Sequence, residues 1–140
     1  MDTSKYTKKV VVISAESTLI EAAKLMKQKN VGCLVVIKDK KQDSAPVGML
    51  TDRDIVIKCL ADKKDASSTR VKDIMSENLL TIKKDQGIKE MMTLLAQEGV
   101  RRAPVVDENN KVCGLVAMDD MLTLIANELN SIKNVIEKQM

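Results

Sequence analysis

Two aspartates that end similar segments, and one pair of adjacent arginines, are charged side chains of this sequence that a binding site could use. Asp54 ends the segment GMLTDRD, and Asp120 ends the similar segment GLVAMDD. A carboxylate can accept hydrogen bonds from two neighbouring hydroxyl groups, and the start of a helix offers free N–H groups to an anion. Arg101 and Arg102 supply two adjacent cations. Side chains of these types favour binding over bond-breaking chemistry.

The sequence lacks the residues that most enzymatic and metal sites require. It has no histidine, hence no Ser/His/Asp set, and no glycine-rich phosphate loop. Cys33, Cys59 and Cys113 are far apart without C-x-x-C spacing, and zinc would lack its usual nitrogen ligand. We therefore expect no enzyme, no catalytic residue, no metal and no catalytic cofactor, and we expect reduced cysteines in the core.

Composition narrows the class of protein further. Hydrophobic residues make up 44% of the 140 residues and charged residues 31%, as in ordinary globular domains. The net charge of +3 is mild, the lysines are scattered and Tyr6 is the only aromatic residue, so we expect no nucleic-acid partner. No apolar run is long enough for a bilayer and no secretion leader is visible, so we expect a cytoplasmic protein without a membrane span.

The chain contains two copies of one pattern. A constant shift of 69 positions superimposes residues 10–38 on residues 79–107, with apolar positions in register. After a loop three residues longer in the first copy, the shift becomes 66 and aligns Asp54 with Asp120. Apolar positions, helix boundaries and both aspartates coincide, which indicates an internal repeat.

Each copy has the periodicity of a β-α-β-β-α unit. The expected strands cover 10–13, 34–37 and 47–50 in the first copy and 79–82, 103–106 and 112–116 in the second. The expected helices begin at Thr18 and end at Asn30, run from Thr51 to about Leu60, cover 87–97 before Gly99, and extend from near Met118 to about Lys138.

The first helix carries the clearest local signals. Thr18 and Glu21 have the spacing of a capping box, and Asn30 suits a left-handed stop. Residues at helical spacing predict one apolar face, formed by Leu19, Ala22, Ala23 and Met26.

One copy is too small to bury a good core alone, so the copies must share one. We predict an α+β fold in which two β-α-β-β-α repeats pack sheet to sheet about a pseudo-twofold axis. The polar stretch 61–70, ADKKDASSTR, suggests the connection. We place the first repeat at 1–62, the linker at 63–70 and the second repeat, with an extended C-terminal helix, at 71–140.

Three stretches, PVGMLTDRDI, VKDIMSENLLTI and GVRRAPVVDENNKVCGLVAMDD, resemble the CBS-pair family, or Bateman module, and the resemblance covers essentially the whole chain. The family signature is Gly, two apolar residues, Thr or Ser, two variable residues and Asp. The first copy has it complete, whereas Ala117 replaces the hydroxyl in the second. The resemblance implies a regulatory module that senses energy or metabolites by binding AMP, ADP or ATP, or S-adenosylmethionine or NAD, between the repeats.

The resemblance also implies which residues bind. The main cleft would use Met49, Thr51 and Asp54 together with Arg101 and Arg102. Asp54 would accept hydrogen bonds from the ribose hydroxyls, and Thr51 and the helix start would face ribose or phosphate. The arginines occupy the positions of phosphate-binding cations in a relative, the regulatory γ subunit of AMP-activated kinase.

A second, weaker cleft would pair Ala117 and Asp120 with Gly32 and Cys33. It would have no hydroxyl and no cations at those positions. We therefore expect a phosphorylated ligand in the first cleft, and in the second something smaller, less charged or nothing.

Other interpretations stay open. The pair Thr51 and Asp54 is also an ordinary helix-capping signature, and Arg101 and Arg102 can be solvated surface charge. A ligand-free module for oligomerisation and protein interaction is the main alternative function. A nucleic-acid-associated regulator would need a basic patch that the sequence does not show.

The final helix is longer than its counterpart in the first copy. Its apolar residues recur at steps of three and four positions, namely Leu122, Ile125, Leu129, Ile132 and Ile136. Nothing in the first copy corresponds to the part beyond about Glu128. We expect this part to be buried against a second copy in a twofold homodimer, with folding back onto the first repeat as the alternative.

Overall fold

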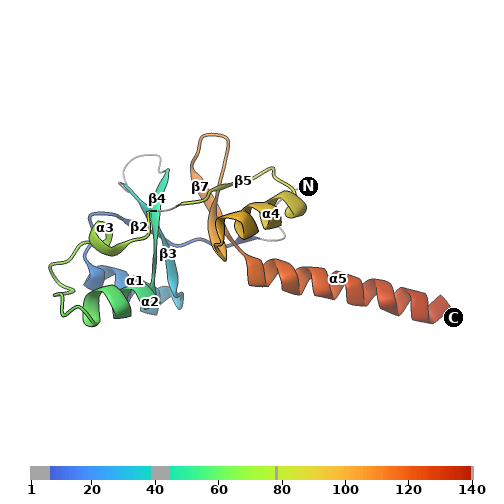
Figure 1. The fold of residues 1–140 in the computed structure, drawn as a ribbon, viewed down its shortest axis with the longest axis horizontal. Coiled ribbons are helices and arrows are strands. Elements are labelled where there is room, and N and C mark those ends of the chain that lie inside the picture. The colour runs from blue at the N-terminus through green and yellow to red at the C-terminus, as the bar shows by residue number, and fades with distance from the viewer. Residues whose placement is uncertain (1–6, 39–44, 78, 140) are drawn as a thin grey trace.

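The structure, a computed structural model, describes residues 7–38, 45–77 and 79–139. Figure 1 shows two groups of strands side by side in the middle of the molecule, with helices on their outer sides. The elements in chain order are β1 (Thr7–Lys8), β2 (Val12–Ser14), α1 (Leu19–Lys29), β3 (Cys33–Ile37), β4 (Pro46–Thr51), α2 (Asp52–Ile55), the π-helix η2 (Val56–Leu60), α3 (Val71–Ile74), β5 (Ile82–Lys83), α4 (Ile88–Glu98), β6 (Arg102–Val106), β7 (Val112–Ala117) and α5 (Met118–Gln139).

The strands form two sheets of matching topology. The first has the order β2-β3-β4 and the second β1-β7-β6-β5. Within each repeat the first strand is parallel to the second, and the second is antiparallel to the third. The predicted pair of β-α-β-β-α repeats is therefore confirmed.

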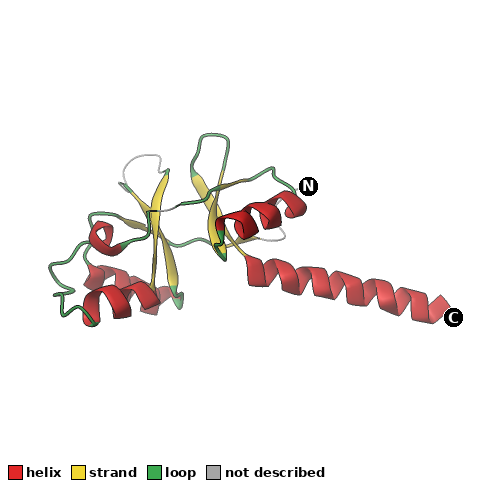
Figure 2. Cartoon of the chain, viewed as in Figure 1, coloured by secondary structure: helices red, strands yellow, loops and turns green. Residues whose placement is uncertain are grey.

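The two sheets pack face to face, as predicted, and helices lie on their outer sides, whereas most of α5 projects away from both (Figure 2). Each repeat has its own core between sheet and helices, the first around Leu19, Leu34 and Leu50. A third cluster, in which Cys33, Val35 and Leu115 are buried, lies between the sheets. Because strands from both repeats supply this cluster, each sheet covers the apolar inner face of the other.

Each repeat also covers an edge of the other repeat's sheet. Thr7 and Lys8 form β1, which pairs antiparallel with β7 of the second repeat. At the equivalent place in the other sheet, the backbone of Ser76 forms two hydrogen bonds with that of Met49 on β4 of the first repeat, at 2.9 and 3.0 Å. Thr7 and Ser76 are related by the same shift of 69 positions that aligns the repeats. This exchange of edge segments, which the sequence did not predict, links the two repeats through backbone hydrogen bonds.

The first helix follows its local signals with one exception. The Glu21 N–H donates to Thr18 Oγ1 at 3.2 Å, and Asn30 ends the helix in the left-handed region with φ 55°. Leu19, Ala22 and Met26 are buried, as predicted. The prediction for Ala23 is wrong, because this residue is exposed at the edge of the packed face.

Other boundaries differ from the predicted ones. The first strand of each repeat is shorter and later, at β2 and β5, and α2 ends after four residues. Beyond it the Ala61 N–H donates to the carbonyl of Val56 at 2.9 Å, the spacing of a π-helix. The short helix α3 was not predicted. Its Val71 and Ile74 complete the first core, so tertiary packing rather than periodicity accounts for this helix.

Candidate functional site

Both signature segments lie at the same end of the two sheets. Thr51, the last residue of β4, pairs with Cys33 at the start of β3. In the second repeat, Ala117 at the end of β7 pairs with Arg102 at the start of β6. Because a helix begins directly after β4 and another after β7, this end of the molecule also holds Asp54 and Asp120. We call this end, with Cys33, Thr51, Asp54, Arg102, Ala117 and Asp120, the mouth.

A side chain of the second repeat acts on a buried thiol of the first at this end of the sheets. Burial raises the pKa of the Cys33 thiol, while the charge of Arg102 and a side-chain hydrogen bond from it oppose this rise. The charges of Asp54 and Asp52 raise the pKa of Cys33 further. A cation of the second repeat and carboxylates of the first therefore act on the same thiol.

The structure gives Asp54 a capping role. The Thr51 N–H donates to Asp54 Oδ2 at 3.0 Å, and the Asp54 N–H donates to Thr51 Oγ1 at 3.1 Å, which is a complete capping box. Lys58 Nζ lies 3.5 Å from Asp54 Oδ1. The Asp54 side chain is nevertheless 20% exposed, so part of its carboxylate remains accessible to solvent.

The start of α2 does not offer free N–H groups to an anion, contrary to expectation. In addition to the two N–H groups of the capping box, the Asp52 N–H donates to the Gly32 carbonyl at 2.9 Å. The Arg53 N–H donates to Asp52 Oδ1 at 2.8 Å. Side chains and the Gly32 carbonyl, just before β3, satisfy all four groups, so binding of an anion at the mouth would rest on the arginines.

Both arginines lie beside the second signature. A cavity of about 310 Å³ is lined by Arg101, Arg102, Ala117, Asp119 and Asp120. This lining joins the second signature to both arginines, a combination that the two expected clefts did not include, and the expected clefts themselves stay a prediction. The reason for this lining is the antiparallel pairing of β6 and β7, which places both arginines beside the second signature, while the Cys33 contact places Arg102 near the first.

Asp119 and Lys58 contact predicted site residues but were not themselves predicted from the sequence. Arg101 Nη2 donates to Asp119 Oδ1 at 3.2 Å, with both side chains largely exposed. Lys58 bridges Asp54 and the Ile74 carbonyl, to which its Nζ donates at 3.2 Å. The helical spacing of four positions between Asp54 and Lys58 was a signal available in the sequence.

Gly32 and Met49 lie close to the mouth and affect its shape rather than its charge. A Cβ atom at Gly32 would lie 2.9 Å from Asp52 Oδ2, so a side chain here would require the exposed Asp52 carboxylate to move. Met49 is partly buried against the cluster between the sheets, and its backbone pairs with Ser76. Both residues therefore shape the walls near the mouth.

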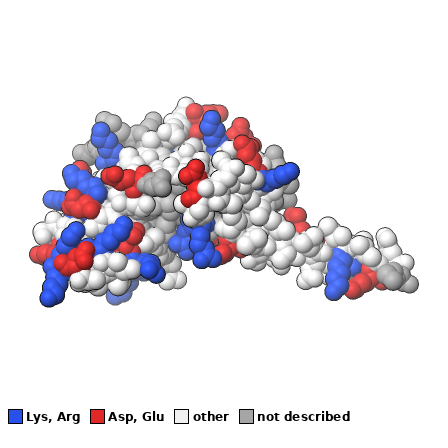
Figure 3. Space-filling view, viewed as in Figure 1, with Lys and Arg blue, Asp and Glu red and all other residues white. Residues whose placement is uncertain are grey.

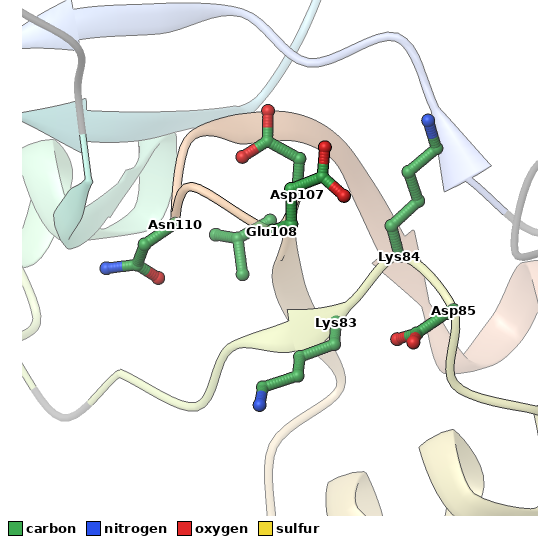
Figure 4. Close-up of a pocket in the computed structure, with 7 residues that line it drawn as sticks. Lys83, Lys84, Asp85, Asp107, Glu108 and Asn110 are labelled. Atoms are coloured by element: carbon green, nitrogen blue, oxygen red, sulfur yellow. The ribbon is translucent and has the colours of Figure 1, made fainter.

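A larger cavity of about 850 Å³ lies away from the mouth. Figure 4 shows its side chains, which come from the end of β5 and from the hairpin between β6 and β7. It is lined by Lys83, Lys84, Asp85, Val106, Asp107, Glu108 and Asn110. Val106 ends the strand that Arg102 begins, so this cavity is at the opposite end of the sheet. Its charges are of mixed sign, and no predicted site residue lines it.

Two further features of the described residues bear on function. Residues 7–38, 45–77 and 79–139 contain no group of three or more His, Cys, Asp or Glu side chains placed to hold a metal ion. No helix within the same ranges is both long and apolar enough to cross a bilayer.

The repeats, the sheet packing and the paired signatures define a tandem domain of known type. The family model of the CBS domain matches residues 4–60 and again residues 71–127. The chain therefore belongs to the CBS domain family, of which it contains a pair of repeats.

Relatives of the pair come from distant organisms. CBS domain-containing protein YhcV of Bacillus subtilis is 39% identical over 115 residues, which are 82% of this chain and 78% of YhcV. Uncharacterized protein MK0525 of Methanopyrus kandleri is 34% identical over 113 residues. That alignment covers 81% of this chain but only 56% of MK0525, so the chain spans little more than half of that relative.

A solved structure confirms the fold. The crystal structure of Hypoxic Response Protein I with two coordinated zinc ions superimposes with a TM-score of 0.73 at 29% identity, covering 88% of this chain and 98% of that one. The zinc ions belong to that protein. This chain has no histidine.

Proposed function

We propose that this chain is a non-catalytic, cytoplasmic regulatory module that binds an adenine nucleotide in the mouth between its two repeats. The contact between Arg102 and Cys33 carries the proposal, because it brings a cation of the second repeat beside the signature of the first. AMP, ADP and ATP are the first candidates, and S-adenosylmethionine and NAD are further ones.

The groups at the mouth match the parts of a nucleotide. Ribose hydroxyls donate to the accessible part of the Asp54 carboxylate, in exchange for its contact with Lys58. Phosphate oxygens accept charge-assisted hydrogen bonds from Arg101 and Arg102. To bind phosphate, Arg101 gives up its ion pair with Asp119. This loss costs little free energy, because both side chains are largely exposed to water.

Binding across two repeats is what makes the module regulatory. A ligand that touches both repeats binds more tightly to some relative positions of the repeats than to others. Its binding therefore shifts the equilibrium between these positions, and an attached or associated protein responds through the same coupling free energy. The regulated protein is a further partner in this proposal.

Calorimetric titration with AMP, ADP, ATP, NAD and S-adenosylmethionine tests the proposal directly, after a thermal-shift screen. We expect at least one adenine nucleotide to bind. Replacing Asp54 by Asn removes the negative charge and one of the two acceptor oxygens offered to the ribose, and should weaken binding of that ligand about 30- to 1,000-fold, equivalent to roughly 2–4 kcal/mol. Asp120→Asn is the matched control, because it changes the equivalent residue of the other repeat.

Each outcome has a definite meaning. If no adenosine ligand binds the folded chain, nucleotide sensing is wrong. If Asp120→Asn weakens binding and Asp54→Asn does not, the ribose lies in the cavity of the second signature, and the assignment to Asp54 is wrong. Unfolding curves of both variants check that the fold survives.

A second candidate function is an interaction module whose mouth stays empty. The exposed apolar side chains on η2 and α5 favour it, among them Leu60, which is 64% exposed, and Leu129, which is 62% exposed. Under either function we propose a homodimer formed through helices. The interaction module alone predicts assembly without any response to nucleotides.

A further inference from the structure

The C-terminal half of α5 has no partner among the described residues of its own chain. Met121 is the last buried residue of the helix, and every residue from Ala126 to Gln139 is exposed. Figure 1 shows α5 projecting away from both sheets and from the other helices. Folding back onto the first repeat, the alternative considered from the sequence, is therefore not what the structure shows.

One face of this projecting helix is apolar. Leu122 is 49% exposed, and the stripe continues along the helix at steps of three and four residues through Ile125, Leu129, Ile132 and Ile136. On the visible side in Figure 3 the projecting helix is mostly uncharged, with a group of charged side chains near its far end. The exposed part of the helix, from Ala126 to Gln139, is 14 residues long. An isolated helix of about that length is marginal in water, so burial of the apolar stripe would stabilise it.

We propose that the α5 helices of two copies pair through this stripe as a parallel two-stranded coiled coil. The spacing gives a heptad repeat in which Leu122, Leu129 and Ile136 occupy the a positions and Ile125 and Ile132 the d positions. The occupant is a second copy because the stripe has the narrow a/d pattern that packs against an identical helix. The twofold axis then runs along the paired helices.

The charges flanking the stripe set the orientation. Glu128 occupies a g position and Lys133 the following e position. In a parallel pair these positions face each other across the interface, so Glu128 of each copy meets Lys133 of the other. An antiparallel pair would instead place g against g and e against e, which brings like charges together. Charge complementarity therefore favours parallel helices.

The same pair does not interact within one helix. Residues five positions apart point in directions about 140° apart on a helix, and only spacings of three and four bring side chains together. In the single chain Lys133 Nζ lies 3.9 Å from Glu137 Oε1, one turn further on. An energetic link between Glu128 and Lys133 would therefore have to act between two copies.

This inference goes beyond nucleotide binding and does not depend on it. The paired part of α5 lies outside the mouth, and its test uses no nucleotide. Loss of the coiled coil would leave the proposed function in place, and failure to bind nucleotides would leave the coiled coil in place.

Sedimentation equilibrium of the full chain measures the assembly. We expect a dimer whose dissociation constant rises at least about 100-fold in Leu129→Asp, because a charge would be buried in the seam. Asn127→Asp, on the opposite face of the same helix, is the matched control and should change it less than about threefold. Circular dichroism and an unfolding curve show that both variants keep the folded repeats.

Two results would overturn the proposal. One is a monomeric intact chain at concentrations of about 100 μM. The other is a dimer that survives Leu129→Asp but dissociates in Leu60→Asp, which would place the interface on the exposed side of η2 instead.

Cross-linking and charge exchange test the orientation. In a Cys113→Ser background, which removes the exposed native thiol, Ile136→Cys should form a disulfide between copies, while Asn134→Cys on the outer face should not. Glu128→Lys and Lys133→Glu should each weaken the dimer about two- to tenfold, and the double exchange should restore it. Absence of the disulfide at position 136 in a dimer, or a double exchange no better than the single ones, would exclude the parallel arrangement.

Discussion

Cys33 of the first repeat and Arg102 of the second occupy equivalent positions, and their side chains meet between the two sheets. Equivalent residues touch each other only where a twofold axis passes between them, so this contact marks the pseudo-twofold axis of the pair. Because one of the two equivalent residues is a thiol and the other a cation, the side chains do not obey the twofold symmetry at this point. The mouth is therefore asymmetric in its side chains even though the backbone repeats.

The Cys33 thiol reports on the charges around it. Burial raises its pKa above the ordinary value of 9.0, and Arg102 opposes the rise. Arg102→Ala should therefore raise the pKa of Cys33 further, whereas Asp54→Asn should lower it, because that carboxylate raises it at present. Peptide-resolved alkylation rates as a function of pH measure both shifts. Two unchanged pKa values would mean that neither charge faces the thiol in solution.

The same pKa predicts how stability depends on pH. The unfolded thiol ionises near pH 9.0 and the folded thiol only at higher pH. The stabilising contribution is thus fully present below pH 9 and is lost as the pH rises through the folded pKa. Cys33→Ala should flatten the dependence of the free energy of unfolding above pH 9. Denaturant unfolding curves between pH 8 and 10.5 would show an unaltered slope if this linkage were absent.

The arginine pair should distinguish phosphorylated from unphosphorylated ligands. Charge-assisted hydrogen bonds to phosphate are worth roughly 1.5–3 kcal/mol each, so Arg101→Ala with Arg102→Ala should weaken AMP by about 10- to 150-fold for each such bond removed. Adenosine should be weakened much less. Arg53→Ala, an exposed arginine in the first turn of α2, is the control. Equal effects on AMP and adenosine would exclude a bond to phosphate.

Lys58 should stabilise the connection between the repeats. Its Nζ bridges Asp54 and the carbonyl of Ile74, near the end of α3. Lys58→Met keeps the apolar stem but removes the donor, and we expect the free energy of unfolding to fall by about 0.5–1.5 kcal/mol. Lys24→Met, on the exposed side of α1, should change it by less than about 0.5 kcal/mol. Equal effects of the two substitutions would show that the bridge contributes nothing.

Gly48 should not tolerate a side chain. A Cβ atom there would lie 2.7 Å from Met75 Sδ and 2.8 Å from the Ser76 carbonyl oxygen, and the second contact is with backbone. Gly48→Ala should therefore displace the edge segment from β4 and cost about 1–3 kcal/mol in the free energy of unfolding. Gly87→Ala, where nothing lies within 4 Å, should cost less than about 1 kcal/mol as a weaker helix cap. Urea denaturation measures the free energy of unfolding of both variants. A Gly48→Ala protein as stable as the Gly87→Ala protein would contradict the close packing.

The sequence by itself determined the repeat, the β-α-β-β-α order and the ends of α1, α4 and α5. These features depend on residues a few positions apart. Thr18 caps α1 through Glu21, and Asn30 ends it, because both effects act within one turn of helix. The apolar stripe of α5 was visible for the same reason, since its spacing is a property of one helix.

Only the tertiary structure decided what lies beside the signatures. The pairing of β6 with β7 places Arg101 and Arg102 beside Asp120, and the packing of the sheets brings Arg102 to Cys33. Neither of these proximities can be read from nearby residues in the sequence, because each brings together residues from separate elements. The exchanged edge segments at Thr7 and Ser76 are equally hidden, since backbone hydrogen bonds carry no mark of side-chain type. Contacts between elements depend on how whole sheets pack, and that packing is decided by all of their buried residues together.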